Sequence, residues 1–118
     1  MNTELTPADL LERAADGFES GRYGWTKGVA YARRTDGFES YCATGALYHE
    51  AGLQQVSLIG TTEYETCGTT YREADKALEQ VVENIVTRWN DYAASGVAEV
   101  IENMKEAAKN LRNKEEAR

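Results

Sequence analysis

The sequence contains little proline, cysteine or histidine, and it has no long apolar run. One proline, two cysteines and one histidine occur in 118 residues. Without about 18 consecutive apolar residues, the chain is not expected to span a membrane. The first residues also lack the basic and then apolar pattern of a secretory signal. We therefore expect a soluble cytoplasmic protein, in which Cys42 and Cys67 are free thiols.

Basic residues are also scarce. Thirteen Lys and Arg stand against 20 Asp and Glu, which gives a net charge of -7 at pH 7. This charge repels nucleic-acid phosphates unless the basic residues cluster, and Arg33 and Arg34 are the one adjacent basic pair. The acidic residues are dispersed, which disfavours a mimic of DNA. We expect no direct binding to nucleic acid or membrane, and the acidity favours a basic protein partner.

The length of 118 residues is typical of one domain, so residues 1–118 are predicted to form a single unit. A hydrophobic fraction of 42% suffices for a packed core. No internal repeat or linker divides the chain. The expected fold class is mainly α: a compact bundle of four to five helices with a small β-hairpin or irregular β element. Residues 114–118 are expected to fray.

Four helices are predicted from caps and apolar spacing. They span approximately residues 7–20, 40–51, 70–89 and 96–113. Thr6 and Ser40 are the predicted N-caps of the first two helices, and Thr70 with Glu73 forms a capping box for the third. The third helix either runs unbroken or breaks near Asn84, where the residues are weaker helix formers. A break there would give five helices.

Two segments lack a helical pattern. Asp36 and Gly37 suit a two-residue turn between residues 29–34 and 38–41, which predicts a short hairpin or an irregular loop. The second strand of this hairpin and the helix after it compete for Tyr41 and Cys42. Residues 53–69 are rich in threonine and glycine, and they predict a strand fragment inside a long loop.

Cys42 and His49 are the first candidates for chemistry. Cys42 would lie in the first helical turn, where backbone N–H groups stabilise a thiolate, but its small neighbours favour a closely packed helix with an inert thiol. His49 would stand about 10 Å further along an ideal helix, too far for proton transfer over about 3 Å. Cys67 and Glu50 are the other nearby ligand types. Because no zinc-type spacing or nucleotide-binding motif is present, we predict no metal site and no cofactor.

Trp89, Asn90 and Asp91 form the most distinctive tripeptide. In a structural interpretation, Trp89 closes the core while Asn90 or Asp91 ties down a helix terminus or a loop. In a functional interpretation, the indole, amide and carboxylate form one wall of a pocket for a small polar ligand. The structural interpretation is the one that we favour.

Three short motifs follow one another along the chain: Gly24 and Trp25, then YCATGAL at residues 41–47, then WND at residues 89–91. This order, followed by an amphipathic helix, resembles an uncharacterised family of small actinobacterial and actinobacteriophage proteins over most of residues 8–111. Members of that family often carry a cysteine directly after the Gly-Trp pair, where this chain has Thr26. The resemblance implies an actinobacterial or phage origin and supplies no activity.

The leading functional hypothesis is a non-enzymatic protein-interaction module, which in a phage would act as an accessory protein on a host protein in the host cytoplasm. Its predicted contact residues are Tyr23, Trp25, Tyr31, Phe38, Trp89, Asn90 and Asp91. The alternative is a small-molecule-binding protein or enzyme with a pocket of four residues: Cys42, His49, Trp89 and Asp91. Long apolar stripes on the helices also favour a homodimer.

Overall fold

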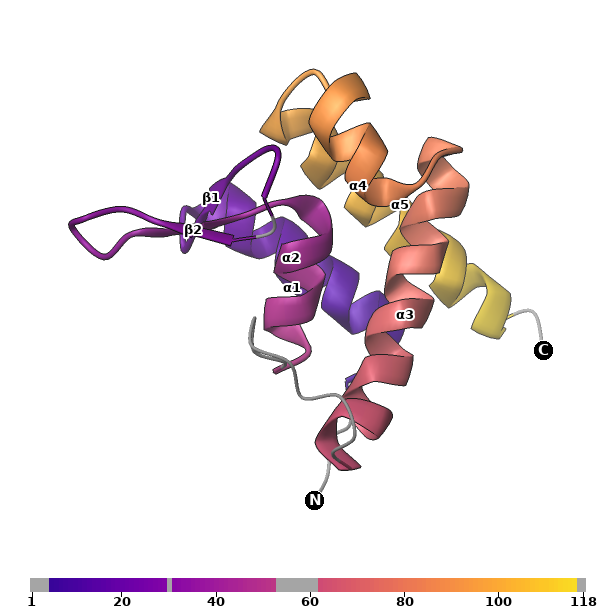
Figure 1. The fold of residues 1–118 in the computed structure, drawn as a ribbon. Coiled ribbons are helices and arrows are strands. Elements are labelled where there is room, and N and C mark those ends of the chain that lie inside the picture. The colour runs from indigo at the N-terminus through magenta and orange to yellow at the C-terminus, as the bar shows by residue number, and fades with distance from the viewer. Residues whose placement is uncertain (1–4, 30, 53–61, 117–118) are drawn as a thin grey trace.

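The protein is a group of helices with a small sheet at one end. A computed structural model describes residues 5–29, 31–52 and 62–116 (Figure 1). The elements in chain order are α1 (Pro7–Ser20), β1 (Gly24–Trp25), β2 (Tyr31–Arg33), β3 (Glu39–Tyr41), α2 (Ala43–Glu50), α3 (Thr62–Val82), α4 (Val86–Arg88), the π-helical turn η1 (Trp89–Ala93) and α5 (Val97–Glu116). The predicted fold class, mainly α with a small β element, is confirmed.

The helix α1 begins at the predicted cap. The Thr6 hydroxyl accepts a hydrogen bond from the backbone N–H of Asp9, and the Asp9 carboxylate accepts one from the backbone N–H of Thr6. This reciprocal pair satisfies two N–H groups that a helix start leaves without partners. The chain then turns back closely after α1. The absence of a side chain at Gly17 allows this, because the Tyr23 ring occupies the place where a Cβ on Gly17 would lie.

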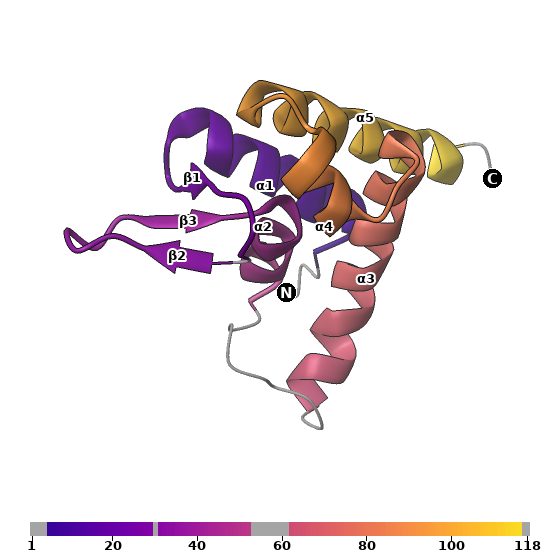
Figure 2. The same ribbon diagram turned by 45° about the horizontal axis from the view of Figure 1, so that its top comes forward.

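The buried apolar side chains form one core. The helix α5 packs along α1 and also contacts α3, while α2 contacts α1 and α3 and the sheet extends to one side of the helices (Figure 2). Leu10, Leu11, Leu47, Leu78 and Met104 are fully buried, and each contributes roughly 1.5–3 kcal/mol through the removal of its side chain from water. Within the described residues, no helix combines the length and the apolarity that a membrane span requires.

Ion pairs fix the contact between α1 and α5 at the surface. The Arg112 guanidinium binds Asp9 at 2.9 Å and Glu12 at 2.5 Å, and Lys105 binds Glu19 at 3.0 Å. Hydrogen bonds from the Thr6 backbone and from Arg112 lower the pKa of Asp9, and the hydrogen bond from Arg112 lowers the pKa of Glu12. Both carboxylates therefore stabilise the fold in their ionised form.

Replacing Arg112 with glutamine should lower the free energy of unfolding by about 1 kcal/mol at pH 7, because these partly exposed pairs are screened by solvent. A carboxyl group with a lowered pKa in the fold stabilises it above the unfolded-state pKa, and this contribution is lost as the pH falls through the folded-state pKa. The difference from the parent should therefore shrink below about pH 4 in urea denaturation. Lys109→Gln, at an exposed position of the same helix, is the control. A difference that does not change with pH would contradict the assignment.

The sheet is built around β3. The strand β2 pairs with it antiparallel and β1 pairs with it parallel, in the order β1-β3-β2. The predicted hairpin is confirmed, but its turn is one residue longer than predicted. The backbone N–H of Arg34 donates to the carbonyl of Phe38 across a loop of residues 35–37, in which Gly37 takes the left-handed φ of 90°. This geometry is typical of three-residue hairpins.

The prediction of Ser40 as a helix cap is wrong. Ser40 lies in β3, where it pairs with Gly24 and Ala32, so the helix α2 cannot start until the ladder has ended. Cys42 is the N-cap, and its sulfur accepts the backbone N–H of Gly45 at 3.2 Å. Of the two residues for which the strand and the helix compete, Tyr41 therefore belongs to the strand and Cys42 to the start of the helix.

The prediction that Thr70 caps the third helix is also wrong. The helix α3 starts at Thr62, so Thr70 lies inside it, and residues 62–69 of the predicted loop are helical. Residues 53–61 of that loop lie outside the described residues. The capping box of Thr70 and Glu73 is a local signal, so it does not report tertiary contacts. The low helix propensity of threonine and glycine costs at most about 1 kcal/mol per residue, and packing can offset this cost.

The break near Asn84 is confirmed. The helix α3 ends at Val82, Glu83 takes a left-handed φ of 55°, and the short helix α4 starts at Val86. At the other end of the chain, α5 extends to Glu116, and the fraying of the last residues stays a prediction. Residues 117–118 lie outside the described part.

Candidate functional site

The three sequence motifs meet at the side chain of Asn90, in η1. Its Oδ1 accepts hydrogen bonds from the indole Nε1 of Trp25 at 2.6 Å and from the backbone N–H of Ala43 at 2.9 Å. Its Nδ2 donates to the carbonyl of Thr26 at 3.0 Å and to the carboxylate of Asp91 at 3.0 Å. One amide thus joins β1, the first turn of α2 and the π-helical turn.

Asn90 has no spare hydrogen-bonding capacity for a ligand. Its side chain is fully buried, and both of its oxygen lone pairs and both of its N–H groups have partners. In the described residues, every buried side-chain nitrogen and oxygen has a hydrogen-bond partner. The geometry supports the structural interpretation of this residue.

Asp91 fixes the loop after β1 against η1. Its Oδ1 accepts the backbone N–H of Gly28 at 2.8 Å as well as the Asn90 amide. Gly28 has φ 84°, a conformation that side chains other than glycine rarely adopt. These two hydrogen bonds to Asp91 Oδ1 give the loop of residues 26–29 a defined place beside the π-helical turn.

Trp89 is part of the core. Its side chain is 4% exposed, and its indole Nε1 donates to the Glu99 carboxylate at 3.2 Å. Glu99 also accepts hydrogen bonds from the Ser95 hydroxyl and backbone N–H, which lower its pKa. The indole thereby links η1 to the first turn of α5.

The Cys42 thiol is buried at the start of α2. Burial raises its pKa, and this effect outweighs the opposing hydrogen bonds from the backbone N–H groups of Gly45 and Thr44. A helix N-terminus alone therefore does not yield a thiolate here. The environment is that of the inert thiol that the sequence favours over a reactive one.

His49 lies at the other end of α2 from Cys42. Its ring stacks on Tyr41, with ring centroids 4.7 Å apart, and its Nδ1 lies 3.2 Å from the Tyr41 hydroxyl. Burial raises the pKa of Tyr41 to about 12. We name Asn90 and the residues that its side chain binds the Asn90 junction: Trp25, Thr26, Ala43 and Asp91. Of the four residues of the predicted pocket, Asp91 belongs to this junction and Trp89 and Cys42 adjoin it in sequence, whereas His49 contacts the aromatic residues near the sheet.

The predicted contact aromatics differ in exposure. Tyr23 is buried and donates its hydroxyl hydrogen to Glu50 at 2.8 Å, while burial raises its pKa. Trp25 and Tyr31 are half-buried, and Phe38 is 36% exposed at the end of the hairpin. The side chains of this set that can reach a partner are therefore Phe38 and the accessible edges of Trp25 and Tyr31.

Two exposed apolar side chains beside the Asn90 junction are absent from the sequence-based prediction. Tyr92 in η1 is 86% exposed, and Val29 in the loop after β1 is 52% exposed. In a regular α-helix, a residue three positions after the buried Trp89 would share its inward face. Because η1 is π-helical, that spacing no longer applies, and the sequence carries no signal for the exposure of Tyr92.

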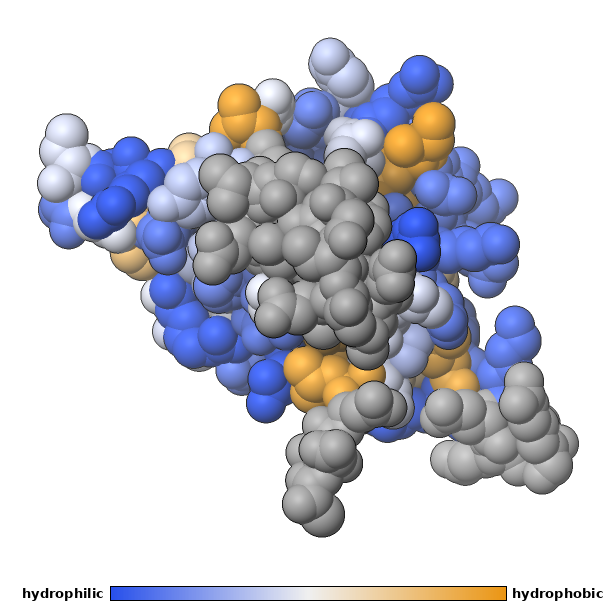
Figure 3. Space-filling model, turned by 60° about the horizontal axis from the view of Figure 1, so that its bottom comes forward, coloured by the Kyte–Doolittle hydropathy of each residue, from blue (hydrophilic) through white to orange (hydrophobic). Residues whose placement is uncertain are grey.

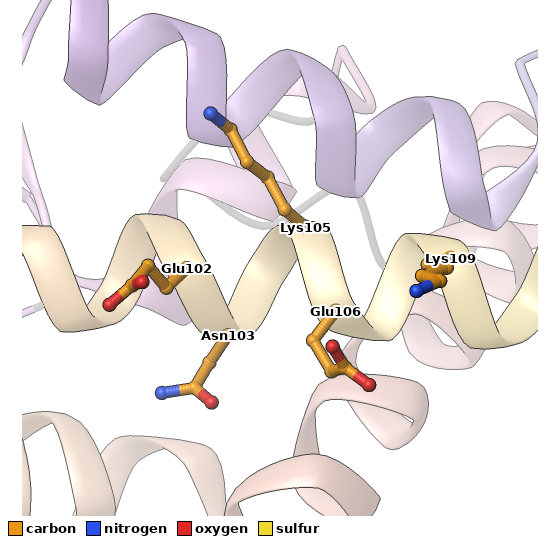
Figure 4. A pocket seen from close by; sticks show the side chains of 5 residues that line it. All are labelled: Glu102, Asn103, Lys105, Glu106 and Lys109. Carbon is orange, nitrogen blue, oxygen red and sulfur yellow. The ribbon is translucent and has the colours of Figure 1, made fainter.

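The rest of the described surface offers weaker candidates for a functional site than the region around Asn90. The hollow in Figure 4 is lined by α5 alone, with Lys105 directed towards α1 while Asn103 and Glu106 point the other way. Figure 3 shows a mostly hydrophilic face with separate apolar spots. Among the described residues, no three side chains of His, Cys, Asp or Glu are grouped so as to hold a metal ion.

Comparison with known proteins gives a family and no activity. A model described as a family of unknown function (DUF6197) matches residues 2–110. No curated protein matches the chain. No solved structure matches it.

Proposed function

We propose that this chain, which belongs to the DUF6197 family of unknown function, is a non-enzymatic protein-interaction module. Its contact surface consists of Lys27, Val29, Arg88 and Tyr92, and we name these four residues the Tyr92 patch. The observation that carries the proposal is the 86% exposure of Tyr92 on a turn that internal hydrogen bonds hold in place.

A hydrogen bond joins the two segments that carry the patch. The backbone N–H of Gly28 lies 2.8 Å from the Asp91 carboxylate. Lys27 and Val29 flank Gly28, and Tyr92 follows Asp91, so each lies one residue from this contact. Tyrosine is enriched among the residues that dominate binding energy at protein interfaces, since it offers a large ring and a hydroxyl group.

The support beneath the patch is preorganised. Asn90 and Asp91 fasten the loop of residues 26–29 to η1 through three hydrogen bonds to the loop and to Trp25. A surface that is already ordered loses less conformational entropy when it binds. Single π-helical turns occur frequently at functional sites, which agrees with a role for η1 beyond packing.

The setting of this function follows from the motifs of the sequence. The resemblance to actinobacterial and actinobacteriophage proteins supports a phage accessory protein that acts on a host protein in the host cytoplasm. The scarcity of cysteine supports a reducing compartment, because small domains stabilised by disulfides are rich in cysteine. Phage origin, host partner and cytoplasmic location are parts of the proposal.

Affinity capture from an actinobacterial lysate tests the proposal. The parent should retain a specific host protein in near-stoichiometric amount, and Tyr92→Ala with Val29→Ala should lose it. Phe38→Ala is the matched control, since it removes a partly exposed ring from the hairpin. Thermal melts of each variant should stay close to that of the parent.

Two outcomes would contradict this assignment. Capture that is lost in Phe38→Ala but kept in the Tyr92 variant would place the contact on the sheet. The absence of any protein that depends on either surface would oppose the interaction function itself.

A further inference from the structure

We infer that two copies of this chain pair through the outer edge of β2, so that their two small sheets join into one continuous sheet. The inference goes beyond the proposed function, because it concerns the hairpin and not the Tyr92 patch. Three features carry it: backbone groups of β2 that no strand uses, a two-fold register that pairs all of them, and side chains that match across the axis.

The strand β2 leaves hydrogen-bonding groups at the edge of the sheet, since the strand order is β1-β3-β2. The backbone N–H of Arg34 donates to the carbonyl of Phe38, so the backbone groups of Arg34 point towards β3. The direction alternates along an antiparallel strand, and the N–H and C=O groups of Tyr31 and Arg33 therefore point outward. Within the described residues no strand pairs with this edge, and the hairpin projects from the helices (Figure 2).

A two-fold axis at Ala32 uses these outward groups completely. If two β2 strands run antiparallel with Ala32 opposite Ala32, Tyr31 of each copy lies opposite Arg33 of the other. Each of these two pairs exchanges two backbone hydrogen bonds. A register with Tyr31 opposite Tyr31, or with Arg33 opposite Arg33, would leave half of the outward groups of β2 without a partner strand.

The side chains match in the same register. Tyr31, Arg33, Glu39 and Tyr41 lie on one face of the sheet, and an axis normal to the sheet keeps this face common to both copies. Each Arg33 guanidinium then lies beside the Tyr31 ring of the other copy, which is a favourable cation–π arrangement. The Tyr31 hydroxyl binds Glu39 at 2.8 Å, so the same guanidinium also approaches a carboxylate. Like charges would face each other if Arg33 stood opposite Arg33, which disfavours that register.

The charge of the hairpin is balanced. Residues 31–41 contain two arginines, Arg33 and Arg34, and two acids, Asp36 and Glu39, so the net charge of -7 arises elsewhere in the chain. At an ionic strength of about 0.15 M, exposed charges more than about 8 Å apart are largely screened. The general repulsion between two acidic copies is therefore weak at the edge of β2.

The dimer is closed and weak. A two-fold contact uses the same edge of both copies, so no β2 edge remains for a third copy. Short length and charged side chains usually protect an edge strand from pairing. In β2 the pairing of Arg33 with Tyr31 removes the obstacle of charge, whereas the length of three residues limits the buried area. We therefore expect exchange between monomer and dimer instead of a permanent assembly.

Analytical ultracentrifugation tests this pairing over about 10 µM to about 1 mM of the parent protein. The mass should rise from that of a monomer towards that of a dimer and not beyond. Arg33→Pro should weaken the dimer at least tenfold, because it removes an outward N–H group. The N–H groups of Ala32 and Arg34, which point towards β3, remain in this variant. Tyr92→Ala is the control on the other surface and should leave the dimerisation constant unchanged.

Cross-linking gives a measurement that does not depend on the folding of the proline variant. At the axis the two Ala32 residues form a non-hydrogen-bonded pair with Cα atoms about 4.5 Å apart, which suits a disulfide. Under mild oxidation, Ala32→Cys should form a covalent dimer at least tenfold faster than Arg34→Cys. Arg34 is the matched position, because its side chain lies on the same face two residues from the axis. The parent, which keeps both native cysteines, is the second control.

Several results would overturn the inference: a monomer mass over the whole range, a mass beyond the dimer, a folded Arg33→Pro that dimerises like the parent, or equal cross-linking at the two positions. A dimer that is lost in Tyr92→Ala would also overturn it, because the contact would then lie on the Tyr92 patch. Capture of a host protein by Arg33→Pro should match that by the parent. The proposed function and this inference can therefore fail independently.

Discussion

Replacement of Asn90 with alanine is expected to lower the free energy of unfolding by about 3–5 kcal/mol. The substitution leaves the indole N–H of Trp25 and the backbone N–H of Ala43 without an acceptor in a buried site. A buried polar group that loses its partner costs roughly 1–3 kcal/mol, and two such groups are created here. Urea denaturation followed by circular dichroism gives the difference.

Asn90→Asp is the matched variant, because it keeps the oxygen acceptor and the shape of the side chain. It loses the two N–H bonds to Thr26 and Asp91, and it places a second carboxyl group beside Asp91. Burial and this neighbouring charge raise the folded-state pKa of the new carboxyl group, so its destabilisation should grow as the pH rises from about 5 to 7. A near-neutral Asn90→Ala would show that the amide does not join the three segments.

Replacement of Trp89 with alanine should cost roughly 3–5 kcal/mol, because it removes a large ring from the core and leaves a cavity. It also removes the indole donor to Glu99, which connects η1 with the start of α5. Thermal and urea unfolding should agree on the loss. Circular dichroism of the folded variant should still show a mainly helical protein at low temperature.

Tyr92→Ala is the control for this prediction. Its ring is 86% exposed, so the change should stay within about 0.5 kcal/mol. The comparison separates two aromatic residues three positions apart in one turn. Equal losses in the two variants would contradict the division of η1 into a buried side and an exposed side.

Local patterns predicted the parts of the fold that depend on near neighbours. The start of α1 follows from Thr6 and Asp9, three residues apart, whose hydrogen bonds need no tertiary partner. The apolar spacing in the second half of the chain likewise predicted the helices that bury Leu78 and Met104. The hairpin was predicted from the turn chemistry of Asp36 and Gly37.

The parts that sequence reasoning missed depend on distant contacts. The strand β1 has only two residues, and it exists because it pairs in parallel with β3. The Asn90 side chain binds groups 47 and 65 residues away, which no local pattern reports. Ser40 resembled a helix cap because a short motif does not reveal that a strand ladder occupies the same residue.

The candidate site could be predicted only in part, because some of its features also depend on distant contacts. The tripeptide at residues 89–91 was singled out, and its structural interpretation placed the correct residue types at a helix terminus and a loop. The exposure of Tyr92 was missed because the π-helical turn shifts the helical spacing after Trp89.

The position of Asn90 in the chain also affects the order in which the protein can assemble. The backbone N–H of Ala43, in the first turn of α2, donates a hydrogen bond to the side-chain oxygen of Asn90, a residue 47 positions later. During synthesis, the segment from α1 to α2 therefore leaves the ribosome before the acceptor for that N–H has been made. The link that Asn90 makes between β1 and α2 must wait for η1, so the sheet end of the protein is completed late in translation.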